Sequence, residues 1–190
     1  MAKKSRKKAK KKNPSKSMNP VPSGFRTVTA YLVVNDGARA IEFYKKAFGA
    51  KELSRNNTPD GKVLNAQIKI GDSIVMLSDE FPGSAAKSPL SLGSSTVTLH
   101  VYSKNADKLW EQVLSCGARI TMPLENQFWG ERYGMLVDPL GHHWSISQRI
   151  KMSPKEKEER RKAAMAMFAE GGQDTTAKAP EGGESPAGVS

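Results

Sequence analysis

Two histidines are the residues of this chain best suited to acid–base chemistry. His100 lies in an alternating run of apolar and polar residues, and His143 directly follows a turn in a second such run. If both runs form strands, alternation directs the two imidazoles, together with Ser145, to one face of a sheet. The pair could act as general acid and base or form part of an unusual metal site. The alternative is that both histidines are hydrogen-bonded residues that line a polar surface. No carboxylate lies in register beside them, which favours this alternative.

His142, Cys116 and two tryptophans are weaker candidates for a functional site. His142 has the opposite parity to His143 and lies beside the turn, so we expect it on the surface. The single cysteine, Cys116, excludes an internal disulfide framework and a thiolate zinc cage. It ends an apolar helical stripe with no base nearby, which favours a small buried hydrophobe over a nucleophile. Trp110 and Trp144 have the parity of packing residues.

A second candidate for ligand binding is the segment 124–133, which we expect to connect two strands. It sets three aromatic residues among charged and amide side chains: Phe128, Trp129 and Tyr133. Aromatic rings offer contact area and Arg132 could hold an anionic group, which favours a ligand-binding lip. The alternative is structural, with Trp129 fixing the loop to the sheet and Arg132 pairing with Glu125 or Glu131. On another predicted strand, Asn65 and Gln67 could reach the same site or face solvent.

The formal net charge of +11 is concentrated in one segment. Residues 1–17 carry nine Lys or Arg residues and no acidic residue, and the rest of the chain is nearly neutral. Such a block predicts a disordered tail that could associate non-specifically with nucleic acid. No aromatic residue is interleaved with the lysines, so base-specific recognition is not expected. The alternative is a solvated tail without a specific partner.

Length and composition restrict the classes of protein to which the chain can belong. The chain has 190 residues, a mean hydropathy of -0.55 and no apolar run near the roughly 18 residues that a span requires, which predicts a soluble protein without a membrane span. One cysteine and no apolar segment after the lysines indicate a cytoplasmic location. We predict a disordered Lys-rich tail and linker (1–24), a folded domain (25–150), a C-terminal helix opened by the capping box at 153–156 (151–170) and a disordered tail (171–190).

The folded region repeats one order of elements. Residues 28–34 and 96–101 predict strands, and each is followed by a capped amphipathic helix that ends at a glycine, residues 36–49 and 105–117. Three shorter strands follow each helix, and residues 79–94 join the halves. The offset is about 67 residues from Thr29 to Thr96 and about 68 from Gly49 to Gly117. The pattern predicts an α+β fold of tandem βαβββ modules.

Two stretches of this repeat resemble a known family. They are "YLVVNDGARAIEFYKKAFGAKE" (31–52) and "LENQFWGERYGMLVDPLGHHWSIS" (124–147). Together with the tandem βαβββ order, they resemble the vicinal oxygen chelate superfamily of glyoxalases, bleomycin-resistance proteins and extradiol dioxygenases, in its PhnB-like branch. Some members of that branch bear a methyltransferase name, but no Gly-rich loop between a strand and a helix offers a nucleoside site here.

The resemblance implies a U-shaped mixed sheet with helices on its convex face and the site in its concave face. In metal-using members the ligands lie on the first and last strand of each half, and alignment places Thr29, Met76, Thr96 and Ser145 there. Two threonines, a thioether and a serine are not an adequate ligand set. We therefore predict no cofactor, and a divalent metal only at a displaced site near His100 and His143.

The sequence thus predicts a protein that binds a small organic molecule in the concave sheet, without the usual metal. The expected ligand-binding residues are Thr29, Tyr31, Met76, Thr96, Thr98, His100, Trp129, Arg132, His143 and Ser145. One alternative is a metal-dependent lyase, isomerase or dioxygenase that uses the displaced site. Another is non-specific nucleic-acid association through residues 1–17. Family resemblance also implies a homodimer.

Overall fold

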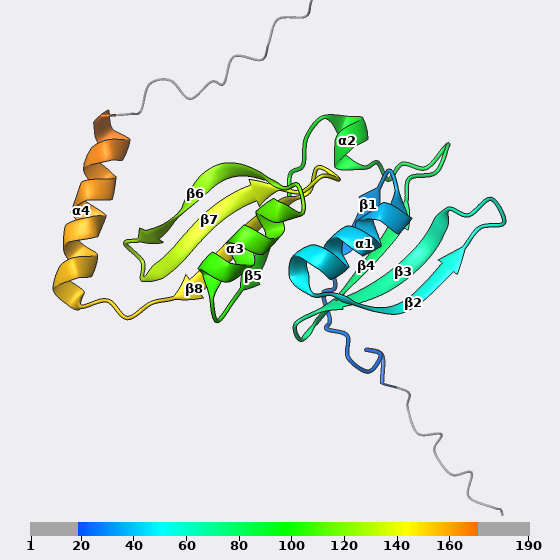
Figure 1. Ribbon diagram of the computed structural model, residues 1–190, viewed down its shortest axis with the longest axis horizontal. Helices are drawn as coiled ribbons and strands as arrows, with labels where there is room; N and C mark the ends of the chain where they lie inside the picture. The colour runs from blue at the N-terminus through cyan, green and yellow to red at the C-terminus, as the bar shows by residue number, and fades with distance from the viewer. Residues whose placement is uncertain (1–18, 171–190) are drawn as a thin grey trace, which may run out of the picture.

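The computed structural model describes residues 19–170 of the chain (Figure 1). The predicted tail 171–190 lies outside this range, as do residues 1–18 of the predicted tail and linker (1–24), which include the basic segment 1–17. The first module consists of β1 (Tyr31–Val34), α1 (Gly37–Phe48), β2 (Lys51–Asn57), β3 (Val63–Ile70) and β4 (Ser73–Asp79). The second consists of β5 (Thr98–Tyr102), α3 (Ala106–Ser115), β6 (Arg119–Gln127), β7 (Glu131–Val137) and β8 (His143–Arg149). This order confirms the predicted α+β fold with two βαβββ modules.

Each module forms its own four-stranded mixed sheet. The strand orders are β1-β4-β3-β2 and β5-β8-β7-β6, so β1 and β5 are edge strands. Each edge strand pairs in parallel with the last strand of its module, and the other pairs are antiparallel. Within residues 19–170 no strand of one sheet pairs with a strand of the other. The continuous U-shaped sheet expected from the resemblance is thus divided at its centre, between β1 and β5.

Alternation along the strands separates the two faces of each sheet. Leu32 and Leu77 are buried under α1, and Trp144 and Ile146 are buried on the side of α3. The residues between them along each strand point to the opposite side, which we call the open face. In Figure 1 both α1 and α3 lie on the viewer's side of their sheets, so both open faces point away from the viewer.

The helices α1 and α3 begin at the predicted caps. The side chain of Asp36 accepts a hydrogen bond from the Arg39 amide, and that of Asn105 accepts one from the Lys108 amide. Gly49 ends α1 with a φ of 64°, in the left-handed region that glycine adopts without strain. These short-range caps fix where each helix starts relative to the strand before it.

The modules share one hydrophobic core because α1 packs against α3. The rings of Phe48 in the first module and Trp144 in the second stack with centroids 4.3 Å apart, and Tyr44 lies 5.7 Å from Trp144. Gln112 of α3 also donates a hydrogen bond of 2.6 Å to the Lys46 carbonyl of α1. These contacts set how the two sheets face each other.

A buried carboxylate ties the modules together. Asp138 begins the turn at 138–141 that precedes β8, and its Oδ1 accepts hydrogen bonds from the amides of Leu140 (2.8 Å) and His142 (2.9 Å). Its Oδ2 accepts from the Tyr44 hydroxyl (3.0 Å) and from Trp144 Nε1 (2.9 Å). Burial, followed by the negative charge of Asp138, raises the pKa of Tyr44 well above its usual value, so the hydroxyl remains a donor.

The segment that connects the two modules is held in place by the carboxylate of Glu80. It contains the short helix α2 (Pro89–Leu92). Glu80 accepts hydrogen bonds from the Ser91 hydroxyl (2.7 Å) and the Ser88 amide (2.9 Å), and Lys87 pairs with it at 3.2 Å. These hydrogen bonds lower the pKa of Glu80 to about 2. The connection is therefore fixed to the end of β4.

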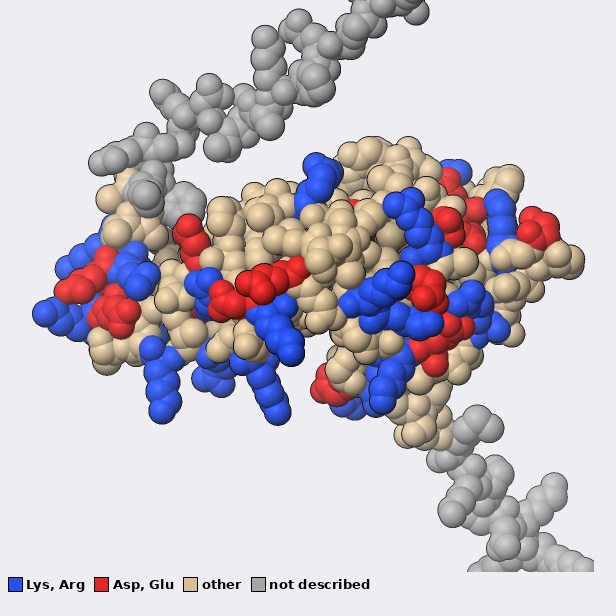
Figure 2. Space-filling view, viewed as in Figure 1, with Lys and Arg blue, Asp and Glu red and all other residues tan. Residues whose placement is uncertain are grey.

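The chain continues after β8 into α4 (Pro154–Glu170), whose first turn is capped by Ser153. Acidic and basic side chains lie intermixed along α4 and over the first module on the face shown in Figure 2. Arg160 of α4 donates a hydrogen bond of 3.3 Å to the Asn126 carbonyl, which anchors α4 at the end of the β6–β7 hairpin. Among the described residues, no helix is long and apolar enough to cross a membrane.

Two predictions about the strands are wrong. The segment 124–133 is not a loop: β6 and β7 pair through Gln127 and Glu131, with a tight turn between them. The offset between the modules is 69 residues, from Tyr31 to His100 and from Asp36 to Asn105, rather than about 67. Thr98, not Thr96, is therefore the counterpart of Thr29. The parity is unchanged, because both offsets are odd.

Candidate functional site

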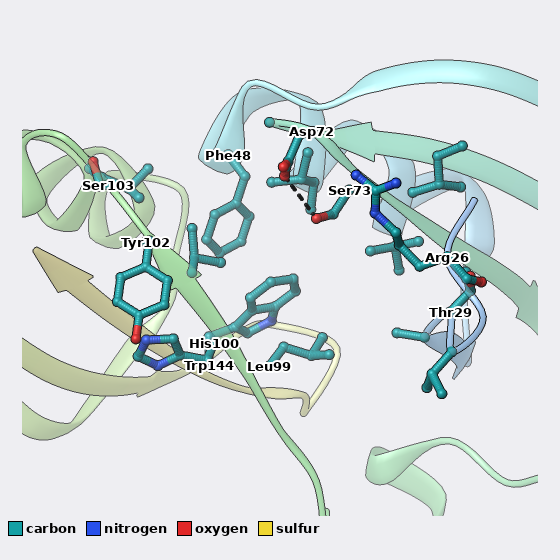
Figure 3. A pocket seen from close by; sticks show the side chains of 18 of the residues that line it. Arg26, Thr29, Phe48, Asp72, Ser73, Leu99, His100, Tyr102, Ser103 and Trp144 are labelled. Carbon is teal, nitrogen blue, oxygen red and sulfur yellow. Dashed lines mark hydrogen bonds between the residues drawn. The ribbon is translucent and has the colours of Figure 1, made fainter. Parts of the chain in front are cut away.

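A pocket of about 590 Å³ lies between the two modules, which we call the inter-module pocket. The edge strand β5 and the residues that lead into β1 form two of its walls, and the turn between β3 and β4 forms a third. The volume is within the usual range for small-molecule sites. Figure 3 shows its lining side chains from close by.

The floor of the pocket is apolar. It includes the stacked pair Phe48 and Trp144, and around this pair lie aliphatic residues of both modules: Ile70, Ile74, Val75, Leu99, Val101 and Leu109. In Figure 3 Phe48 and Trp144 lie at the centre of the lining residues. A ligand that covers this floor would remove apolar surface from water, which stabilises the complex.

His100 and Tyr102 form the wall on the β5 side. His100 Nδ1 lies 2.7 Å from the Ser145 hydroxyl oxygen on the neighbouring strand β8. The imidazole also contacts two aromatic rings, with Tyr102 edge-on at 4.5 Å and Tyr133 nearly parallel at 6.0 Å. Ser145 is only 2% exposed, whereas His100 is exposed. The serine therefore orients the ring while the other ring nitrogen, Nε2, stays available to a ligand.

The rim of the pocket is polar and charged. Arg26 and Lys104 contribute two cations from opposite modules, and Asp72 contributes one carboxylate. The Ser73 hydroxyl donates to Asp72 at 3.0 Å, a bond that Figure 3 draws above the floor. Within the described part of the chain, neither Arg26 nor Lys104 forms an ion pair.

The structure brings several predicted residues together on the open faces. Tyr31 pairs with Met76 across β1 and β4, and His100 pairs with Ser145 across β5 and β8. Thr98 pairs with His143 one step further along the same strands. His143 does not line the inter-module pocket, so the two histidines share a face without sharing the pocket.

The two outer threonines lie just outside the strands. Thr29 precedes β1, lines the inter-module pocket and donates a hydrogen bond of 3.0 Å to the Arg26 carbonyl. Thr96 precedes β5 and lines a separate pocket of about 390 Å³ that is formed by β1, the start of β5 and α2. The two threonines therefore do not meet.

The β6–β7 turn places Trp129 against the open face of the second sheet. Its ring meets Tyr133 at 5.5 Å, and its Nε1 donates to Glu131 at 3.1 Å. The Ser147 hydroxyl donates to the same carboxylate oxygen at 2.8 Å. Trp129 is 43% exposed, so it extends the aromatic surface next to His100 and Tyr133 rather than closing it.

The prediction that Arg132 belongs to the ligand-binding surface is wrong. Arg132 lies on the opposite face of β7 and forms hydrogen bonds of 2.6–2.9 Å with Asp107 of α3. The guanidinium lowers the pKa of the Asp107 carboxyl. The predicted pairing with Glu125 or Glu131 is also wrong, since Arg132 fixes α3 to its sheet.

His142 is not at the surface as predicted. It is 7% exposed, and its Nδ1 is buried without a hydrogen-bond partner among residues 19–170. Burial lowers the pKa of His142, against the opposing charge of Asp138, so the ring is neutral near pH 7. It lies beside the smaller pocket, where the turn at 138–141 is enclosed by α2.

The positions that the resemblance assigns to metal ligands do not fit a metal. The resemblance placed them at Thr29, Met76, Thr96 and Ser145, but the two threonine positions are wrong. Strand pairing places Tyr31 opposite Met76 and His100 opposite Ser145, so the corrected four are Tyr31, Met76, His100 and Ser145. Only one of the four, the imidazole, is a strong ligand, and divalent metals in proteins need several such donors. In the described range, no three His, Cys, Asp or Glu side chains gather into a possible metal site.

Several residues of the pocket carry no signal in the sequence. Arg26 lies just before the first predicted strand, and Asp72 and Ser73 lie where one predicted strand turns into the next. They reach the pocket because the modules dock against each other. Glu131 and Tyr133 do not line the pocket, and the sequence pattern was sufficient to assign their face. Alternation through the buried Gly134 and Leu136 places both on the open face and Arg132 behind it.

Comparison with known proteins agrees with this architecture. The family model described as Glyoxalase/Bleomycin resistance protein/Dioxygenase superfamily matches residues 26–146. An uncharacterized protein from Mycobacterium tuberculosis (strain H37Rv) is 43% identical over 127 residues, which cover 65% of this chain and 75% of that protein.

Two solved structures are similar as well. A gene product from Arabidopsis thaliana matches with a TM-score of 0.52 at 26% identity, covering 65% of this chain and 98% of that one. A Bacillus cereus structure described as a putative 3-demethylubiquinone-9 3-methyltransferase, PhnB protein, matches with a TM-score of 0.54 at 19% identity, covering 65% and 99%. The second likeness concerns the fold alone.

Proposed function

Because this chain belongs to the glyoxalase/bleomycin resistance protein/dioxygenase superfamily, we propose that it binds a small organic molecule in the inter-module pocket. The supporting observation is the pocket itself, with a volume of about 590 Å³, an apolar floor and a few polar groups at its rim. This combination is typical of small-molecule sites. The same pocket lies beside the open faces, where the sequence predicts the ligand-binding residues.

Binding proceeds without the metal that other members use. The donor set at Tyr31, Met76, His100 and Ser145 supports this proposal, because it lacks the several strong ligands that a divalent ion requires. Elemental analysis of untagged protein tests it. Stoichiometric zinc, nickel, manganese or iron would instead favour the alternative, a metal-dependent lyase, isomerase or dioxygenase with a displaced site near His100 and His143.

A ligand screen with paired histidine variants tests the site. Ligands that bind the native state raise the unfolding temperature, so a thermal-shift screen of small metabolites identifies binders. His100→Gln should weaken any such binder, because His100 lines the pocket, whereas His143→Gln on the same face should not. Equal loss in both variants would place the ligand on the open face away from the pocket. No binder across a broad screen would contradict the proposal.

We further propose that the protein is a homodimer in which a second copy covers part of the open faces. Aromatic side chains there remain accessible: Tyr31 is 48%, Tyr102 65% and Trp129 43% exposed. Exposed aromatic residues of this kind are enriched in protein interfaces. Sedimentation at micromolar concentration should give twice the chain mass, and a monomer would refute the dimer.

The basic segment 1–17 supports a second, separate candidate function, non-specific association with nucleic acid. Its nine positive charges without an acidic residue would neutralise phosphates and release counterions. Deletion of residues 1–17 should abolish salt-sensitive retention on a nucleic-acid column. Unchanged retention would refute this assignment without affecting the pocket.

A further inference from the structure

We propose that the ligand of the inter-module pocket is a flat, largely apolar molecule that carries one carboxylate. This inference rests on the proposed function and adds the chemical class of the ligand. Three observations support it: the hydrogen-bonding state of His100, the charges at the rim and the composition of the floor.

The environment of Ser145 decides which nitrogen of His100 carries the proton. The Ser145 hydroxyl is buried, and its only hydrogen-bond partner among residues 19–170 is His100 Nδ1, 2.7 Å away. A buried hydroxyl proton without an acceptor is costly, so Ser145 donates and Nδ1 accepts. With Nδ1 accepting, the ring N–H is on Nε2. His100, which lines the pocket, therefore offers an N–H donor that favours a ligand with an acceptor.

The charges at the rim indicate a negative acceptor. Arg26 and Lys104 are exposed, and neither is neutralised by an ion pair in the part of the chain that the structure describes. Asp72 is the only acidic residue that lines the pocket, and it already accepts a hydrogen bond from Ser73. Two cations and one anion leave a net positive rim, which favours an anionic ligand over a cationic one.

The apolar floor of the pocket indicates the chemistry of the part of the ligand that carries no charge. Phe48 and Trp144 stack on each other and line the pocket beside aliphatic side chains such as Leu99 and Val101. Burial of an apolar ligand against this surface stabilises the complex, whereas a sugar or a polyol would find no hydrogen-bond partner on it. Figure 3 shows this floor between His100 on one side and Arg26 on the other. A planar apolar body can cover the floor while its carboxylate reaches the rim.

Three matched probes test the proposal by isothermal titration at low salt. They are 4-hydroxybenzoate, 4-hydroxybenzamide and 4-hydroxybenzylamine, which share one ring and differ in charge. We expect the carboxylate to bind roughly tenfold more tightly than the amide, since charge-assisted hydrogen bonds are the stronger ones. The amine should bind most weakly. Raising the salt concentration should reduce the difference between carboxylate and amide.

Variants then assign the preference to named groups. Arg26→Gln should remove most of the preference for the carboxylate while the amide still binds. His100→Phe keeps a flat ring but removes the Nε2 donor, so it should weaken the carboxylate and the amide alike. Lys108→Gln removes an exposed charge of α3 that does not line the pocket, and it should leave all three affinities unchanged.

The outcomes separate this inference from the proposed function. Equal affinity for the three probes would overturn the charge preference but leave a small-molecule pocket. Binding of other compounds in the broad screen, without binding of 4-hydroxybenzoate, would likewise overturn the aromatic carboxylate. A screen in which no compound binds would overturn the proposed function itself.

Discussion

Removing the hydroxyl of Tyr44 tests how much one hydrogen bond between the modules contributes to stability. Tyr44→Phe removes one atom, which donates a hydrogen bond of 3.0 Å to the buried Asp138 of the other module. The ring and its contacts with Phe48 and Trp144 remain. The substitution therefore isolates one charge-assisted hydrogen bond in the shared core.

The expected loss follows from that bond. Hydrogen bonds to charged groups contribute about 1.5–3 kcal/mol, and Asp138 keeps its other three donors in the variant. We expect Tyr44→Phe to lower the free energy of unfolding by about 2 kcal/mol. Asp138→Asn should cost more, roughly 2–6 kcal/mol, because its NH2 group would replace an oxygen that accepts from two donors, and each buried donor without an acceptor costs about 1–3 kcal/mol.

Urea unfolding followed by tryptophan fluorescence measures both losses. Trp144 donates to the same carboxylate oxygen, so its emission reports on the site directly. Asp107→Asn is the control, since Asp107 is an exposed partner of Arg132 and surface pairs contribute about 0–1 kcal/mol. A loss below about 0.5 kcal/mol for Tyr44→Phe, or a smaller loss for Asp138→Asn than for Tyr44→Phe, would refute the argument.

Three further predictions concern stability. In Gly134→Ala the new Cβ would lie 2.8 Å from the Trp110 ring and from the Leu124 backbone, so unfolding in urea should show a loss of about 1–3 kcal/mol; an unchanged midpoint would show that β6 can shift. Burial lowers the pKa of His142 in the folded state, so its contribution is present above pH 6.5 and is lost as the pH falls below that value. The stability of His142→Gln should therefore depend less on pH between 7 and 5, and parallel pH profiles would exclude this role. Hydrogen bonds hold the pKa of Glu80 at about 2, so its contribution is present above pH 4.5 and is lost between 4.5 and 2. Glu80→Gln should accelerate proteolysis within residues 80–97 at pH 7, and resistance equal to that of the parent would show that α2 is held by other contacts.

Features set by short-range interactions were predictable from the sequence. Asp36 and Asn105 cap their helices by hydrogen bonds to amides three residues ahead, so residue type and spacing were sufficient. The face of each strand followed from alternation, and the open faces indeed hold Tyr31, His100 and Ser145.

Features set by pairing across the sheet were not predictable in the same way. The offset of the repeat was misjudged because Thr29 and Thr96 are alike in type, whereas the true register depends on which residues β4 and β8 present to them. The aromatic segment around Trp129 forms the end of a long hairpin with a tight turn. Its composition is typical of a loop, so the sequence predicted a loop there. That error also assigned Arg132 to the wrong face.

The inter-module pocket depends on docking between parts that are distant in the chain. Arg26, Asp72 and Lys104 have no sequence pattern in common, and only the packing of α1 on α3 brings their segments around one space. The sequence could indicate two modules and the residues on each open face. It could not indicate the space left between them.

The aromatic pair between the modules has a consequence for synthesis on the ribosome. The first module is complete once Asp79 has emerged, but Phe48 and Tyr44 gain their partners only when Asp138 and Trp144 follow. Until then the nascent chain exposes an aromatic surface of α1 that the finished protein buries, and such surfaces promote aggregation. A chain arrested in the connection at 80–97 should therefore recruit chaperones, whereas the completed chain should not.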